Sequence, residues 1–312
     1  MTAPLILSAD AANIARAAAL IDAGGIVAVP TETVYGLAAD ARDARAVAQV
    51  YAAKGRPDFN PLIVHVADLA AAEALASFDP VSRSLAQALW PGPLTLVLPL
   101  RASAGIAAIV TAGLPTVALR VSAHPAMQAL LRESGAPLAA PSANASGGVS
   151  PTRAAHVVRS LGERVPLIIE GGACAQGLES TIVASDGHTI RVLREGPVDR
   201  NRLAATGGVP VLGADAAAGV VAPGMLASHY APGKPLRLDA EAPAGDEYWI
   251  SFGTSAGDYP LSAAGDVVEA AAALYDALHA AAASERPRIA VSPIPADGLG
   301  AAINDRLRRA AA

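Results

Sequence analysis

Short apolar runs and segments of helical periodicity alternate through the first two thirds of the chain. The spacing of apolar residues, with glycine or proline breaks, predicts helices over 10–23, 43–53, 68–77, 82–89, 126–133, 152–160 and 200–204. Apolar runs predict strands over 26–29, 62–66, 94–98, 117–121, 138–140 and 167–170, and a hairpin of 180–184 with 189–193. Strands and helices do not alternate strictly. We therefore expect an α/β fold with a mixed, twisted sheet and helices on its faces.

Two segments between these elements are rich in small or polar residues, and we expect both to be loops. The first, PTETVYGL at 30–37, follows the predicted strand 26–29. The second, 104–115, is rich in glycine and alanine. Loops that follow the carboxyl ends of strands in open α/β sheets are where ligands usually bind.

The composition changes at about residue 207. Gly, Pro and Ala dominate 207–235, as expected of a linker, which nevertheless contains the more specific sequence SHYAP at 228–232. Beyond it, strands are predicted over 236–238, 248–252 and 288–291, and helices over 263–283 and 300–309. The expected organisation is a larger domain at 1–206, a linker or lid at 207–235, and a smaller α/β, Rossmann-like domain at 236–312.

Composition narrows the class of protein. No run approaches the roughly eighteen apolar residues that a membrane span needs, and residues 1–10 lack the pattern of a secretory signal. Cys174, the sole cysteine, excludes an internal disulfide framework and is typical of a reducing cytoplasm. The formal net charge of −5 disfavours a surface for nonspecific nucleic-acid binding. With no Cys/His cluster, we expect no zinc site.

Two further loops carry candidate anion-binding residues. Of 23 basic residues, only Lys54 and Lys234 are lysines, and Lys54 stands two residues before Arg56 on a Gly/Pro turn. A compact ammonium beside a planar guanidinium suits phosphate, although a solvated turn explains the pair equally well. Ser142 and Asn144 follow a predicted strand, where their polar groups could approach phosphate or merely form a turn.

Other polar residues interrupt the predicted strands. His65 and Arg120 stand among apolar neighbours, so each either faces a ligand or is satisfied within the core. Arg194 could point into the same site or pair with Glu195. The chain has no GxxxxGK[ST], GxGxxG, GxSxG or HExxH motif, and no protein nucleophile stands out.

The order of several motifs resembles one family. PTETVYGL, KGRP with NPL and IVHV, PSAN with SG, STIV and REG resemble the YrdC-like threonylcarbamoyl-AMP synthases over about 26–197. The sequence SHYAP and the small C-terminal unit resemble the longer, two-domain form. The resemblance implies that L-threonine, bicarbonate and ATP give L-threonylcarbamoyl-adenylate and pyrophosphate. The product would pass to a tRNA threonylcarbamoyl transferase complex that modifies the adenosine beside the anticodon, with direct tRNA binding weak or absent.

The resemblance also implies roles for individual residues. The signature set with the catalytic role is Lys54, Arg56, Ser142 and Asn144. Contacts to threonine fall on Thr33, His65, Arg120 and Ser180. Contacts to ATP fall on Arg56, Asn60, Thr116, Ala140, Ser142, Ser150, Arg194 and Tyr230. Mg²⁺ would be bound to the triphosphate, without a metal site of the protein. Leu226 stands where many relatives carry a basic residue.

Physical reasoning complements this resemblance. A carbamate oxygen that attacks the α-phosphorus needs positioning and charge neutralisation more than a protein nucleophile. Carbamates and their mixed anhydrides are labile in water, so we expect Ser228, His229 and Tyr230 to cover the site as a lid.

Two alternatives remain. One is a carbamoyltransferase of hydrogenase maturation, which carries acylphosphatase and Cys motifs that this chain lacks. The other is an RNA-binding module acting on tRNA or rRNA precursors without adenylate chemistry, which the net acidity and scarce aromatics disfavour.

Overall fold

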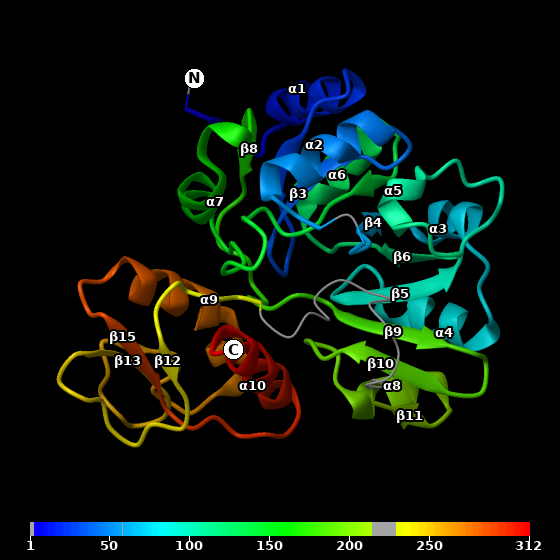
Figure 1. Ribbon diagram of the computed structural model, residues 1–312. Helices are drawn as coiled ribbons and strands as arrows, with labels where there is room; N and C mark the ends of the chain where they lie inside the picture. Colours follow the sequence, from blue (N-terminus) through cyan, green and yellow to red (C-terminus); the bar gives the residue numbers. More distant parts are fainter. Residues whose placement is uncertain (1–2, 58, 214–228) are drawn as a thin grey trace.

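The computed structural model describes residues 3–57, 59–213 and 229–312 (Figure 1). Within them, eleven strands form one large sheet in the order β1-β8-β2-β3-β7-β4-β6-β5-β9-β10-β11. The strands are β1 (Leu5–Ser8), β2 (Val27–Pro30), β3 (Tyr35–Asp40), β4 (Ile63–His65), β5 (Leu94–Pro99), β6 (Thr116–Arg120), β7 (Leu138–Ala139), β8 (Leu167–Glu170), β9 (Thr181–Ser185), β10 (Ile190–Arg194) and β11 (Val211–Leu212). Parallel pairs such as β4 with β6 adjoin antiparallel pairs such as β5 with β6, so the expected mixed sheet is confirmed.

Helices cover both faces of this sheet. They are α1 (Ala11–Asp22), α2 (Ala44–Lys54), α3 (Leu69–Leu75), α4 (Pro80–Leu89), α5 (Ala108–Thr111), α6 (Pro125–Ser134), α7 (Ala154–Leu161), the 3-10 turn η1 (Gly162–Arg164) and α8 (Arg200–Gly207). Alternate residues of β2 enter different cores: Ala28 packs with α2, α4 and α7, whereas Val27 and Val29 pack with α1 and α6. Aspartate caps begin many of these helices, as Asp10 does for α1 and Asp43 for α2.

Both expected loops contain secondary structure. Residues 35–37 begin β3, which pairs antiparallel with β2, so the prediction of a loop through 37 was wrong. The strand is buried between β2 and β7, and a strand buried on both faces shows no polar alternation. Residues 108–111 form α5, which is too short to have a readable period. The short strands β1 and β11 were missed for the same reason.

The C-terminal domain is a four-stranded sheet in the order β12-β15-β13-β14, and its strand pairs are all parallel. Its strands are β12 (Leu236–Arg237), β13 (Glu247–Ser251), β14 (Tyr259–Pro260) and β15 (Arg288–Val291). Its helices are α9 (Val267–Ala283) and α10 (Leu299–Ala310). A parallel sheet with helices is the Rossmann-like arrangement expected from the sequence. No helix of the described segments is long and apolar enough to cross a bilayer.

The two domains share a hydrophobic core. Val34, Val149 and Leu178 of the larger domain pack in one cluster with Tyr230 and with residues of α9 and α10. In Figure 1, α9 and α10 lie on the side of the small sheet nearer the larger domain. The linker positions Leu226 and Ser228 lie outside the described residues. The shared cluster shows that the C-terminal domain packs directly against the β2–β3 turn, the loop after β7 and the loop before β9.

Candidate active site

Strand ends from distant parts of the sequence meet around one cavity. His65 and Arg120 end the parallel strands β4 and β6 and are partners in register. The cavity is concave and partly open to solvent, as small-molecule sites usually are. Its lining residues are Thr31, Thr33, Val34, Gly36, Arg56, Ile63, His65, Arg120, Ala140, Pro141, Ser142, Glu179, Ser180, Arg194, His229 and Tyr230.

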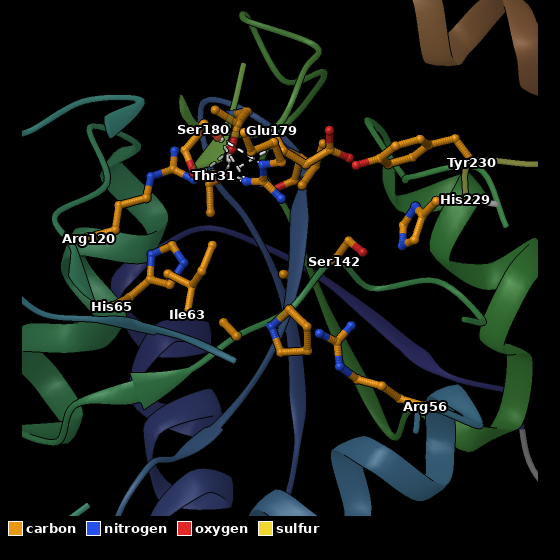
Figure 2. Close-up of a pocket in the computed structure, with 16 residues that line it drawn as sticks. Thr31, Arg56, Ile63, His65, Arg120, Ser142, Glu179, Ser180, His229 and Tyr230 are labelled. Carbon is orange, nitrogen blue, oxygen red and sulfur yellow. Dashed lines mark hydrogen bonds between the residues drawn. The ribbon is translucent and has the colours of Figure 1, made fainter. Parts of the chain in front are cut away.

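The cavity has two polar sides. Figure 2 shows Arg120 and His65 on one side, Arg56, His229 and Tyr230 on the other, and Ser142 between them. The residues expected to contact threonine (Thr33, His65, Arg120 and Ser180) all line the cavity. Of those expected to contact ATP, Arg56, Ala140, Ser142, Arg194 and Tyr230 line it as well. The site can therefore hold two anionic groups, one on each side.

Arg120 is held firmly at the cavity wall. Its Nη2 lies 2.6 Å from Glu32 Oε1, its Nη1 donates to Thr33 Oγ1 at 2.9 Å, and its Nε donates to the Gly92 carbonyl. Burial raises the pKa of Glu32, but Arg120 and Ser122 outweigh this effect and bring that pKa to about 2. Each terminal guanidinium nitrogen carries two N–H groups, so Arg120 can keep these partners and still offer its end to a carboxylate.

His65 is a neutral imidazole in the wall of the cavity. Burial, followed by the nearby charge of Arg120, lowers its pKa to about 3. Its Nδ1 is buried and has no hydrogen-bond partner among the described residues. The sequence-based alternative, a histidine satisfied within the core, does not hold for this nitrogen. A neutral ring beside Arg120 can exchange a hydrogen bond with a bound polar group.

Arg194 reaches the cavity from a β-bulge. The register of β10 against β9 shifts between Val192 and Arg194, and such a bulge changes the direction of a side chain. Its guanidinium donates to the Ser180 carbonyl and, at 3.2 Å, to Ser180 Oγ, which also lies 2.7 Å from Thr95 Oγ1. Glu195 pairs with Arg200 instead, so the expected alternative of an Arg194–Glu195 pair is not formed.

Lys54 does not lie on a solvated turn. It ends α2 and is buried, and its Nζ donates to the carbonyls of Ser142 and Asn144 at 2.5 Å each. Burial, with the charges of Arg56 and Arg164, lowers the pKa of Lys54. The amine can donate both hydrogen bonds in either protonation state. Lys54 therefore anchors the 141–144 loop, and its ammonium does not line the cavity.

Arg56 and Asn144, two further residues of the signature set, both donate to backbone carbonyls. Arg56 donates to the carbonyls of Asn60 and Pro61 while lining the cavity, and burial lowers its pKa to about 10, so it stays charged at neutral pH. The Asn144 amide donates to the carbonyls of Ala145 and Gly148 and so closes its own loop. The side-chain oxygen of Asn60 is buried without a hydrogen-bond partner among the described residues.

Three predicted ATP contacts, Asn60, Thr116 and Ser150, lie outside the cavity lining. Thr116 begins β6 and Arg120 ends it, so the two lie on the order of 13 Å apart along the strand. Ser150 is buried and donates to Glu179 at 2.5 Å. Sequence reasoning overlooked Glu32 and Glu179, because each carboxylate pairs with an arginine about 90 to 130 residues away.

Among the described residues, the one cysteine is not activated and no metal-binding cluster forms. Burial raises the pKa of Cys174 to about 12, which fits the structural role expected for this thiol. No group of three His, Cys, Asp or Glu side chains in the described segments could hold a metal ion. The carboxylates nearest the cavity, Glu32 and Glu179, are both paired with arginines.

Two family models match the chain. The Sua5_yciO_yrdC model, described as "Telomere recombination", matches residues 19–196. A second model, described as "Threonylcarbamoyl-AMP synthase, C-terminal domain", matches residues 192–312. The chain belongs to the Sua5/YciO/YrdC family. With both matches, it is a member of the long, two-domain form of this family, as the motifs indicated.

Known members support this placement. The threonylcarbamoyl-AMP synthase of Bacillus subtilis is 39% identical over 328 residues, covering 98% of this chain and 94% of that protein. The synthase of Pyrococcus abyssi is 42% identical over 221 residues, with 69% and 64% covered. The crystal structure of P. abyssi Sua5 complexed with L-threonine superposes with a TM-score of 0.88 at 34% identity, covering 98% and 97%.

Proposed function

We propose that this chain is an L-threonylcarbamoyladenylate synthase, a nucleotidyltransferase that converts L-threonine, bicarbonate or CO₂, and ATP to L-threonylcarbamoyl-AMP and pyrophosphate. The observation that carries the proposal is the two-sided cavity. Arg120 and His65 lie on one side of it and Arg56 on the other, and Arg194, which is bonded to Ser180, also lines it. A relative that covers 98% of the chain is named threonylcarbamoyl-AMP synthase.

We assign one side of the cavity to threonine. The end of the Arg120 guanidinium suits the threonine carboxylate, and its fixed partners Glu32 and Thr33 keep it in place. Neutral His65 and the Ser180 hydroxyl can contact the amine and hydroxyl of the amino acid. Because none of these groups is a free carboxylate, the amine can react without being held as an ammonium ion.

The other side suits the nucleotide. Arg56 and Arg194 bring two positive charges to the lining. The 141–144 loop offers the Ser142 hydroxyl between Arg56 and the threonine side. Phosphate oxygens bind well to such guanidinium groups. The Mg²⁺ we propose is bound to ATP, where it would neutralise charge on the triphosphate, since no described carboxylate cluster could hold it.

The reaction then needs no protein nucleophile. The threonine amine adds to CO₂, loses a proton and becomes a carbamate. A carbamate oxygen attacks the α-phosphorus of ATP, the bond to the β-phosphate oxygen breaks, and pyrophosphate leaves. Arg56 and Arg194 would stabilise the charge that develops on the phosphates, and the cavity would align the two reactants.

His229 and Tyr230 are proposed to shield the labile product. Both line the cavity, and their rings contact each other with centroids 4.1 Å apart. Burial lowers the pKa of His229 to about 4, so its ring is neutral at physiological pH. A neutral, mostly apolar pair at the cavity wall keeps water from the mixed anhydride without repelling a cationic group.

We also propose that the product passes to a tRNA threonylcarbamoyl transferase complex in the cytoplasm, and that the chain itself binds tRNA weakly or not at all. The single, buried cysteine supports the cytoplasmic location. The acidic net charge supports weak or absent binding of tRNA.

Turnover with labelled bicarbonate tests the proposal. Incubation with ATP, L-threonine and labelled bicarbonate should yield pyrophosphate and a labelled adenylate in equal amounts. Omission of threonine should abolish both products. A salt-dependent shift of tRNA without any ATP turnover would instead favour the RNA-binding module.

A further inference from the structure

A buried carboxylate joins the two domains next to the active site. Glu179 lines the cavity and directly precedes Ser180, but its carboxylate is bonded to groups outside the cavity lining. Its Oε1 accepts from the Ser150 hydroxyl at 2.5 Å. Its Oε2 accepts from Tyr275 Oη at 2.8 Å and from Arg306 Nε at 2.9 Å. Tyr275 lies on α9 and Arg306 on α10, so the C-terminal domain supplies both of these donors.

Arg306 is the most deeply placed of these groups. It is fully buried, an exposure of 0% that arginine reaches only when it is well paired. Besides Glu179, it contacts the carboxylate of Asp305 and donates through Nη2 to the Glu195 carbonyl at 2.9 Å. Its guanidinium carbon also lies 5.3 Å from the centre of the Tyr230 ring, within the range of a cation–π contact.

Tyr230 needs such support because its backbone is strained. Its φ of +66° lies in the left-handed region, which bulky residues rarely adopt and which persists only where the surroundings impose it. The ring stacks on Tyr275, with centroids 5.6 Å apart, and makes an edge contact with His229. Arg306 and Tyr275 thus fix both Glu179 and the residue proposed to cover the product.

Close packing shows that α9 is seated directly on the loop that carries Glu179. A Cβ at Gly177, whose φ is +67°, would lie 2.4 Å from the Ala271 carbonyl oxygen and 2.5 Å from Ala272 Cα. Only glycine allows this approach of two backbones. The position of α9 and the position of the 177–180 loop are therefore mechanically linked.

We propose that Arg306 of the C-terminal domain is a positioning residue for the ATP side of the active site, acting through Glu179 and Tyr230. This inference rests on the proposed synthase reaction. The proposal gives the C-terminal domain a defined role. Through Arg306, the domain neutralises the buried carboxylate of Glu179, which would otherwise compete with the nucleotide for a cation of the site.

The competing cation is Arg194. The groups that face Glu179 are Arg306 on α10, Tyr275 on α9, Arg194 on β10, and Tyr230 and His229 of the linker. Burial alone raises the pKa of Glu179, but Arg306 first and Arg194 second bring it down to about 2. Without Arg306, the buried charge would have Arg194 as its main remaining cation and would draw it away from the phosphates.

Steady-state kinetics of Arg306→Met measure this coupling. The KM for ATP should rise about tenfold or more, while the KM for threonine changes much less, because Arg120 and His65 are not involved. Arg306→Met with Glu179→Gln should recover most of the loss, since no buried charge then remains. Arg308→Met, an exposed arginine on the same helix, is the matched control and should behave as wild type.

The pH profile separates this role from a purely structural one. In Arg306→Met, kcat/KM for ATP should rise relative to wild type from about pH 8 to about pH 6, as Glu179 without its partner becomes protonated. The double variant should lack this rise. An unchanged KM for ATP in Arg306→Met, or a double variant no better than the single one, would overturn the inference.

Two further measurements keep the test decisive. If Arg306→Met does not fold, Glu179→Gln alone and Arg306→Lys replace it. Arg306→Lys should keep the wild-type pH profile because the positive charge remains. A rise of its kcat/KM for ATP towards about pH 6 would overturn the inference. If wild type forms no adenylate, the proposed function fails, and the coupling is then measured by ATP calorimetry on the same variants.

Discussion

The cations near the cavity differ in what they hold. Arg56 and Arg194 line it, whereas Lys54 binds two backbone carbonyls of the loop that carries Ser142. Lys234, the other lysine, likewise donates to the carbonyls of Ala281 and Ser284. Both lysines of the chain therefore fix backbone, and only one of them does so beside the active site.

Replacing Lys54 should reveal this anchoring role. Lys54→Met leaves two buried carbonyls without their donor, which should lower the free energy of unfolding by about 1–3 kcal/mol for each carbonyl. Urea unfolding should show the loss of stability, and the KM for ATP should rise because the 141–144 loop is no longer fixed. Lys234→Met is the matched control: it should lose stability at unchanged KM for ATP. Equal effects of both variants on that KM would contradict the assignment.

Arg120→Lys tests the threonine side. A lysine keeps the charge but cannot hold Glu32, Thr33 and a carboxylate together, since it lacks the planar fork. We expect the KM for L-threonine to rise about tenfold or more, with a much smaller change for ATP. Initial rates with each substrate varied in turn measure both. A rise confined to ATP would place the amino acid elsewhere.

Motif residues were predictable from the sequence, but their partners were not. Thr33, His65, Arg120 and Ser180 stand in recognisable patterns and converge on the cavity. Glu32, Glu179 and Arg306 carry no local signal, because each acts through a residue about 90 to 130 positions away. Lys54 was found for its rarity, yet only the folded chain shows that it binds carbonyls rather than phosphate.

At the scale of elements, helices were predicted best. Apolar spacing gave α1, α2 and α4 nearly to their ends, although α4 begins two residues earlier than predicted. The strand β3 was missed because it is buried on both faces and contains Gly36 amid small residues. This element matters for the site, since its pairing with β2 closes the turn that presents Thr31 and Thr33 to the cavity.

The linker residues at the cavity wall lead to a third prediction. Tyr230→Ala should admit water to the mixed anhydride, so less adenylate should be recovered for each pyrophosphate released. The ratio of the two products, measured over time, gives this directly. Tyr248→Ala, on β13 of the C-terminal domain, should keep the wild-type ratio. An unchanged ratio in Tyr230→Ala would contradict the proposal that Tyr230 shields the adenylate from water.

At the scale of the whole molecule, neutral buried histidines make stability depend on pH. Burial lowers the pKa of His65 to about 3 and the pKa values of His229 and His279 to about 4. Because the folded values lie below the unfolded value, this stability is present above about pH 6.5 and is lost as the pH falls towards the folded values.

The loss should be measurable by urea unfolding between about pH 7 and about pH 5. Each such histidine contributes a slope of about 1.4 kcal/mol per pH unit below its unfolded pKa. His279→Gln should reduce the slope, because it removes one of the buried neutral rings. A flat profile in the wild type would show that these rings bind protons equally in the folded and unfolded states, which would contradict the lowered pKa values.

The central claim is that one cavity holds threonine and the nucleotide together. A crystal structure of this chain with L-threonine, Mg²⁺ and a non-hydrolysable ATP analogue tests it most directly. We predict the threonine carboxylate at Arg120 and the phosphates at Arg56 and Arg194, with the amine facing the α-phosphorus. Density for either ligand outside this cavity, or with Arg56 and Arg194 turned away from the phosphates, would contradict the account.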